Sequence, residues 1–168
     1  MITKATSADI PKLNQLINSA YRGETSKKGW TTEANILEGL RTTEEELYKI
    51  ITSNKHTILK YSHENEIIGS VLLIEENVKL YLGMLTVSPE LQNSGIGKKL
   101  LHEAEIWAKS KNLATIVMTV ISVRAELIAW YKRHGYQETG EKSPFPESNL
   151  HQSTASEPLE FIYLEKQL

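Results

Sequence analysis

Hydrophobic and polar positions follow two different periods along this chain, and the period changes from one segment to the next. A period of two, or a short run of apolar and β-branched residues, predicts strands at residues 2–5, 57–61, 67–74, 79–87, 114–121, 136–141 and 159–165. A period of three to four predicts helices at residues 10–20, 31–40, 44–51, 96–108 and 125–134. This mixture is typical of a sheet covered by helices.

The order of these segments predicts an α+β fold, with helices and strands mixed in three layers. Residues 57–87 hold three strands joined by short turns, and strands so close in sequence are most simply antiparallel. Later strands alternate with helices, so we expect a central mixed and mostly antiparallel sheet of about seven strands flanked by helices. No linker, repeat or low-complexity segment divides the chain, which predicts a single domain over residues 1–168.

Composition narrows the class of protein by exclusion. The 19 Lys and Arg residues against 21 Asp and Glu give a net charge of -2, which argues against nucleic acid and anionic membranes as partners. The N-terminus lacks an apolar signal core, and no apolar run approaches the ~20 residues of a membrane span, so we predict a cytoplasmic protein. The chain has no cysteine, and its histidines lack metal-ligand spacing, so no metal site is predicted.

A glycine-bearing turn between the strand at 79–87 and the helix at 96–108 gives the clearest indication of a binding site. It reads Gln92-Asn93-Ser94-Gly95-Ile96-Gly97, followed by Lys98. Backbone N–H groups at the start of a helix and the positive end of its dipole attract an anion, and glycine lets a bulky oxyanion come close. The turn therefore predicts a site for a phosphate or pyrophosphate.

Spacing separates the phosphate motifs that this turn resembles. A P-loop needs glycine and Ser or Thr where Gln92 and Lys99 stand. A dinucleotide fingerprint needs a third glycine where Leu100 stands. The remaining pattern, Gln-x-x-Gly-x-Gly after a Val-x-Pro strand end, resembles motif A of the GNAT acetyltransferases. The segment Ala-Glu-Leu-Ile-Ala-Trp-Tyr-Lys-Arg-His-Gly-Tyr at 125–136 resembles motif B of the same family.

The resemblance implies the GNAT fold and acetyl-CoA as co-substrate. In the family the turn holds the pyrophosphate, and the backbone of the preceding strand pairs with the pantetheine arm. The cofactor residues so implied are Leu85, Thr86, Val87, Gln92, Asn93, Ser94, Gly95, Ile96, Gly97, Lys98, Arg124 and Tyr131. Arg124 departs from the family, because many members carry Asn there, and an arginine could meet a phosphate or an acidic substrate instead.

Two catalytic residues are expected for acetyl transfer to an amine. The family resemblance implies that Tyr131 protonates the leaving thiolate, since a phenol with a pKa of ~10 is protonated at neutral pH. The alternative for Tyr131 is packing beside Trp130. An amine must also lose a proton, and the strand at 84–87 offers no acid. Glu33 is the first candidate for the base, although a carboxylate in the first turn of a helix is favoured by the dipole alone.

The acceptor side is expected to include Trp30, Glu33, Met84 and Phe145. Glu24, water held beside Met84, and a group on the Pro-Phe-Pro segment at 144–146 are rival sources of the base. The leading hypothesis is direct transfer from acetyl-CoA to a primary amine in a ternary complex. The alternatives are a non-catalytic acyl-CoA sensor and a nucleotide-binding domain without acyl transfer. The sequence leaves open both the acceptor and the oligomeric state, a homodimer included.

Overall fold

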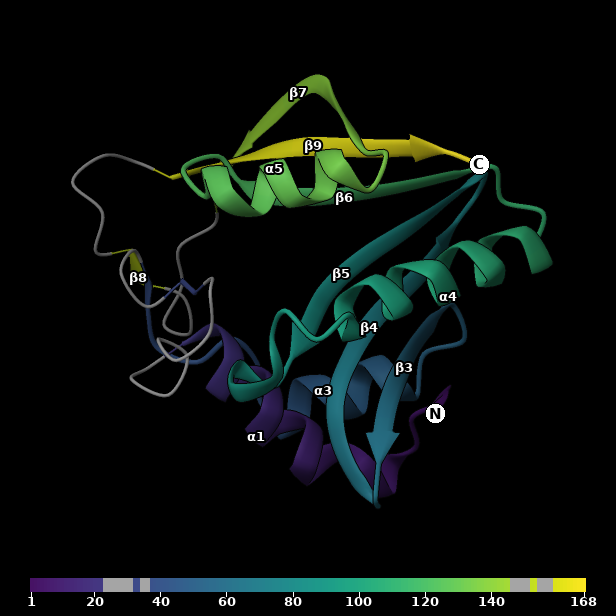
Figure 1. The fold of residues 1–168 in the computed structure, drawn as a ribbon, viewed down its shortest axis with the longest axis vertical. Helices are drawn as coiled ribbons and strands as arrows, with labels where there is room; N and C mark the ends of the chain where they lie inside the picture. The colour runs from purple at the N-terminus through teal and green to yellow at the C-terminus, as the bar shows by residue number, and fades with distance from the viewer. Residues whose placement is uncertain (23–31, 34–36, 146–151, 154–158) are drawn as a thin grey trace.

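Seven strands form one mixed sheet at the centre of the computed structural model (Figure 1), which describes residues 1–22, 32–33, 37–145, 152–153 and 159–168. Every neighbouring pair is antiparallel except β5 and β6, which are parallel. In spatial order the strands are β1 (Ile2–Lys4), β3 (His56–His63), β4 (Glu66–Glu76), β5 (Lys79–Val87), β6 (Thr115–Ile121), β9 (Glu160–Gln167) and β7 (Gln137–Pro144). This arrangement confirms the predicted fold class.

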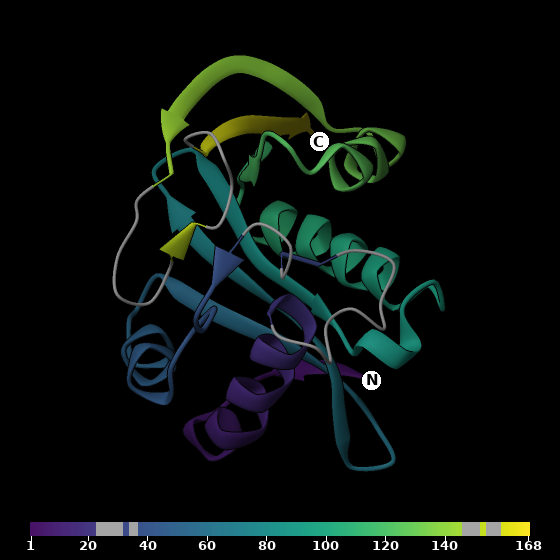
Figure 2. The same cartoon turned by 90° about the vertical axis from the view of Figure 1, so that its left-hand side faces the viewer.

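Helices cover both faces of the sheet, so that the chain forms three layers (Figure 2). Two of them, α1 (Ile10–Tyr21) and α3 (Glu44–Ile51), bury Leu13, Ile17 and Leu47 in a cluster with Ile58 and Leu72 on one face. The helices α4 (Ile96–Ser110) and α5 (Ala125–Arg133) lie on the other face, against a larger cluster built from β4, β5, β6 and β9.

The helix predicted at residues 31–40 is wrong in the part that the structure describes. Residues 32–33 are not helical, and β2 (Leu37–Glu38) pairs antiparallel with β8 (Gln152–Ser153) in a separate small sheet. The apolar spacing of a short segment fits a helix or a strand, and a partner far along the chain decides between them. Residues 31 and 34–36 lie outside the described residues. The other predicted helices and strands are confirmed.

Strands β5 and β6 separate after a short paired section. Their register covers only Lys79–Tyr81 against Thr115–Val117. Beyond it, β5 continues along β4 while β6 continues along β9, and Figure 1 shows the two strands diverging. No described strand pairs with the β6-facing edge of β5 from Leu82 to Val87. The sheet is therefore open in its middle, and backbone groups of β5 are left facing the gap.

A β-bulge in β5 lies beside this gap. The β4–β5 register shifts between Ser70 and Leu72, and Met84 has a φ of 45°. A bulge inserts an extra residue, so the side-chain alternation changes phase after it. Leu80 and Leu82 join the α4 cluster, Met84 turns to the α1 cluster, and Leu85 and Val87 return to the α4 side. The bulge thus aims the end of β5 toward α4 and its N-terminal turn.

Candidate functional site

The predicted phosphate turn joins the end of β5 to α4 through a short 3₁₀ helix (Pro89–Leu91). Asn93 and Gly95 have φ values of 70° and 86°, and successive left-handed and right-handed residues direct backbone N–H groups into a common concavity. The Gln92 side chain donates to the Val87 carbonyl at 3.2 Å, and Ser94 Oγ donates to the Leu91 carbonyl, so both ends of the turn are tied down. The first N–H groups of α4 have no acceptor within the helix.

Gly97 in the first turn of α4 is required by the close approach of α5. A Cβ atom there would lie 3.3 Å from two ring carbons of Trp130 and 3.7 Å from a Val87 methyl group. A larger side chain would have to displace the indole or extend into the space in front of the turn. The absence of a side chain at Gly97 keeps the turn accessible, which fits a bulky anionic group.

A cavity runs from this turn between β5 and α5. Its lining consists of Ala20, Tyr21, Leu85, Thr86, Val87, Gln92, Asn93, Gly95, Ile96, Gly97, Lys98, Arg124, Leu127, Trp130, Tyr131 and His134. Of the residues expected to bind the cofactor, all but Ser94 are in this set. We call this space the cofactor cavity. Its open strand edge, glycine-bearing turn and apolar walls fit a long, partly apolar molecule with a pyrophosphate.

A second cavity adjoins the first on the side of the bulge. It is lined by Tyr21, Arg22, Glu33, Arg41, Tyr81, Leu82, Gly83, Met84, Leu85, Met118, Thr119, Val120, Ile121, Arg124, Leu127, Tyr131, Phe145 and Phe161. Tyr21, Leu85, Arg124, Leu127 and Tyr131 line both cavities. We call the second space the acceptor cavity. It includes three of the four expected acceptor residues, Glu33, Met84 and Phe145, while Trp30 and the rival Glu24 lie outside the described residues.

Tyr131 stands at the junction of the two cavities, on α5. The residue is 6% exposed, and burial raises the pKa of its phenol well above the usual value, with Tyr21 adding to the rise. No hydrogen-bond partner of its hydroxyl occurs among the described residues. By contrast, the Tyr21 hydroxyl donates to the Leu85 carbonyl at 2.8 Å. Tyr131 therefore offers a protonated hydroxyl that is not committed to another protein group.

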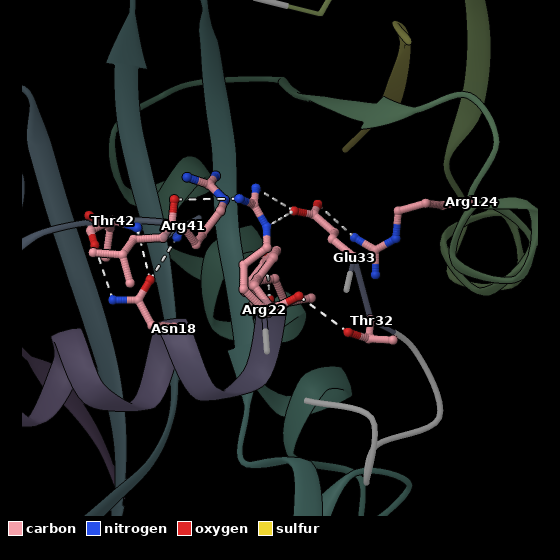
Figure 3. Close-up of polar contacts among 10 residues, drawn as sticks. Asn18, Arg22, Thr32, Glu33, Arg41, Thr42 and Arg124 are labelled. Atoms are coloured by element: carbon pink, nitrogen blue, oxygen red, sulfur yellow. Dashed lines mark hydrogen bonds and ion pairs between the residues drawn. The ribbon is translucent and has the colours of Figure 1, made fainter. Parts of the chain in front are cut away.

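Glu33, which lines the acceptor cavity, lies between two arginines (Figure 3). Arg22 donates to Glu33 Oε1 through Nε at 2.8 Å and through Nη2 at 2.7 Å. Arg124 Nη1 donates to Glu33 Oε2 at 3.0 Å. The three side chains are only 4–8% exposed. Each carboxylate oxygen is thus held by a guanidinium group, which sequence reasoning did not foresee.

Helix ends position this triad. Arg22 follows the last residue of α1, and Arg124 precedes the first residue of α5, where its carbonyl accepts from the N–H groups of Leu127 and Ile128. The Glu33 N–H and the Thr32 hydroxyl both donate to the Tyr21 carbonyl, at 3.0 Å and 3.2 Å. Tyr21, Arg22 and Arg41 were missed as site residues because only the fold brings them together.

The glycine turn and the helix with Tyr131 contain the two motifs that resemble the GNAT family. The model of the acetyltransferase (GNAT) domain matches residues 28–150 of this chain. The chain belongs to the GNAT acetyltransferase family. Membership confirms the family resemblance and the class of enzyme expected from the two motifs. No curated protein matches the chain in sequence.

Solved GNAT structures share the fold at low sequence identity. The ribosomal-protein-alanine N-acetyltransferase from Brucella melitensis is 18% identical, with a TM-score of 0.73 over 100% of this chain and 99% of that one. PaiA N-acetyltransferase from Thermoplasma acidophilum, in complex with coenzyme A, is 19% identical, with a TM-score of 0.70 over 100% and 98%. A GNAT acetyltransferase from Elizabethkingia anophelis with acetyl-CoA bound is 18% identical, with a TM-score of 0.67 over 100% and 97%.

The described residues include neither a membrane-spanning helix nor a metal-binding cluster. None of the described helices is both long enough and apolar enough to span a bilayer. Within the same residues, no cluster of three or more His, Asp or Glu side chains has an arrangement that could hold a metal ion.

Proposed function

We propose that this GNAT protein transfers the acetyl group of acetyl-CoA directly to a primary amine in a ternary complex. The observation that carries the proposal is the junction of the two cavities, where Tyr131 faces both. One cavity has the anion-binding turn and the other does not, so two different molecules can meet beside one proton donor. We also expect residues 1–168 to act as a single domain in the cytoplasm, and these two points stay predictions.

The residues present fit acetyl-CoA, which would supply the activated acetyl group. The backbone from Gln92 to Lys98 would bind its pyrophosphate through N–H groups and the dipole of α4. The edge of β5 at Leu85–Val87 would bind the pantetheine arm as an added strand, chiefly through its N–H groups, because the Leu85 and Val87 carbonyls already accept from Tyr21 and Gln92. A backbone N–H of the same edge would stabilise the oxyanion that develops during transfer.

Tyr131 is proposed to protonate the departing thiolate. Because burial raises its pKa, the phenol stays protonated over the whole range in which amines react. The raised pKa makes the phenol a weaker acid than a thiol, so its first contribution is a hydrogen bond to the sulfur as negative charge develops there. No described residue competes for the Tyr131 hydroxyl, so it is available for that contact.

Glu33 is proposed to position the arginines rather than to accept the amine proton. Both of its oxygens already accept charge-assisted hydrogen bonds, so an incoming amine would have to displace a guanidinium group. Three nearby guanidinium groups also disfavour an ammonium ion, which lowers the pKa of a bound amine. The amine then loses its proton to solvent. The base role expected from the sequence is the alternative that a pH profile tests.

Amine-dependent release of free thiol from acetyl-CoA tests the proposed function. The expected result is release that requires both an amine and the protein, with acetylated amine as the product. A non-catalytic acyl-CoA sensor would bind acetyl-CoA but release no thiol, whichever amine is added. A nucleotide-binding protein would bind ATP or NAD more tightly than CoA.

Coenzyme A should raise the melting temperature of the protein, because a ligand that binds only the native state stabilises that state. Gly97→Val should abolish most of this shift and weaken CoA binding by at least about tenfold. The added side chain would meet Trp130 and occupy the approach to the turn. Differential scanning fluorimetry and calorimetric titration with CoA measure both effects.

Gly140→Val provides the control for this variant. Gly140 has a φ of 91° and lies in β7, away from both cavities, so valine there strains the backbone without touching the turn. The control should melt at a lower temperature and keep its shift with CoA. If Gly97→Val is folded and binds CoA as tightly as wild type, the turn is not the pyrophosphate site.

A further inference from the structure

The acceptor cavity carries a local excess of positive charge. Its described lining contains three guanidinium groups, from Arg22, Arg41 and Arg124, and one carboxylate, from Glu33. The chain as a whole has a net charge of -2, so this excess belongs to the cavity and not to the protein surface in general. Within the described lining the guanidinium groups outnumber the carboxylate, which favours a ligand with a negative charge.

Arg41 differs from the other two arginines in its contacts. Arg22 and Arg124 are engaged by Glu33, but the Arg41 guanidinium has no acceptor among the described residues and lies over the Tyr21 ring, 5.3 Å from its centroid. A cation stacked on an aromatic face keeps its N–H groups in the plane available for an anion. Arg41 is thus the group that can bind a ligand without breaking the triad.

The backbone of Arg41 is fixed from α1. Asn18 Oδ1 accepts from the N–H groups of Arg41 and Thr42 at 2.7 Å and 3.0 Å, and Asn18 Nδ2 donates to the Thr42 carbonyl at 3.0 Å. Figure 3 shows this clamp together with the triad. Backbone bonds and ring stacking together hold the guanidinium in a defined place, as expected of a built binding group rather than a solvated side chain.

The rest of the lining is mostly apolar. Apart from the three arginines and the one glutamate, side chains such as Met84, Leu127 and Phe161 form the walls. An apolar wall beside an anion site suits a ligand with one charged end and an uncharged body. The same wall and the positive charge disfavour acceptors that carry several cationic groups.

We propose that the acceptor is an amino acid with an apolar side chain and that Arg41 binds its carboxylate in the acceptor cavity. This inference rests on the proposed function. A guanidinium group and a carboxylate match in planar, two-point geometry. Fixing the carboxylate at Arg41 leaves the amine free to enter the junction at Tyr131. Polyamines should be poor acceptors, because they bring positive charge to a positive cavity.

Matched pairs of acceptors test the proposal. Leucine and phenylalanine are compared with leucinamide and phenylalaninamide by thiol release from acetyl-CoA, with spermidine as a third class. We expect kcat/KM to be about tenfold or more higher for each acid than for its amide, mainly through KM. The amides have the less basic amines, so easier deprotonation cannot produce this preference. Arg41→Gln should remove it, while Arg133→Gln, an exposed arginine outside both cavities, should keep it.

A binding experiment separates this inference from the proposed function. With CoA present, N-acetyl-leucine should bind more tightly than N-acetyl-leucinamide in wild type and equally in Arg41→Gln, as measured by calorimetry. If the amides or spermidine are acetylated as efficiently as the acids, the inference is overturned and the proposed function still stands. Acid-specific binding without any turnover would support the site and overturn the proposed function. If the protein shows no turnover and no acid-specific binding, both the inference and the proposed function are overturned.

Discussion

Replacing Tyr131 by phenylalanine should lower turnover about 100-fold while leaving CoA affinity almost unchanged. Phenylalanine keeps the ring, which packs edge-on against Trp130 and Tyr136 at centroid distances of 5.2 Å and 5.8 Å. Only the hydroxyl is lost, and that hydroxyl has no hydrogen-bond partner in the part of the chain that the structure describes. Turnover under saturating acetyl-CoA and amine, where chemistry limits the rate, measures the effect.

Tyr136→Phe is a matched control for this substitution. Tyr136 is as buried as Tyr131, and it lines neither cavity. Its hydroxyl has no hydrogen-bond partner among the described residues. Its replacement should leave turnover and stability close to wild type. Equal turnover in Tyr131→Phe and wild type would assign Tyr131 to packing and give the acid role to water. Because burial raises the pKa of Tyr131, no loss of turnover below about pH 10 should come from its ionisation.

Local sequence patterns predicted the sheet and its main helices. The alternation of β5 and the helical spacing of α4 depend on side chains that are neighbours along the chain, so the sequence contains the whole signal. The turn from Gln92 to Lys98 was predictable for the same reason, since consecutive residues form it. All of these but Ser94 line the cofactor cavity.

The acceptor side could not be predicted in the same way. The bulge at Met84 depends on the register between β4 and β5, and no single residue in the sequence marks it. The pairing of β2 with β8 joins residues that are far apart in the chain, and it overrides the helical spacing near Leu37. The contacts of Glu33 with Arg22 and Arg124 span 11 and 91 positions. Such contacts form only in the folded chain, and they produce no periodic pattern in the sequence.

The triad connects the two helices that border the cavities. Arg22 lies at the end of α1, Arg124 lies at the start of α5, and Glu33 forms ion pairs with both. This ion pair network is a polar link between the two halves of the site. A buried network of this kind fixes geometry more than it adds stability, provided that every charge keeps its partner.

Glu33→Gln should therefore destabilise the protein by about 3 kcal/mol or more, because it removes the buried negative charge that two buried guanidinium groups contact. Had Glu33 only favoured the start of a helix, the loss would be about 0.3–1 kcal/mol. Urea unfolding of the two proteins measures the difference. Glu45→Gln is the control, because the Glu45 pair with Lys49 at 3.4 Å is exposed and the same chemical change there should hardly alter stability.

The pH dependence of the same variant distinguishes positioning from proton transfer. If Glu33 only holds Arg22 and Arg124, Glu33→Gln should lower kcat/KM at every pH and leave the shape of the profile unchanged. If Glu33 accepts the amine proton, its own ionisation shapes the acidic limb of the wild-type profile, and the variant must lose or shift that limb. In the described lining of the acceptor cavity Glu33 is the sole carboxylate and no histidine is present, so an unchanged limb would assign deprotonation to solvent or to the amine's own ionisation.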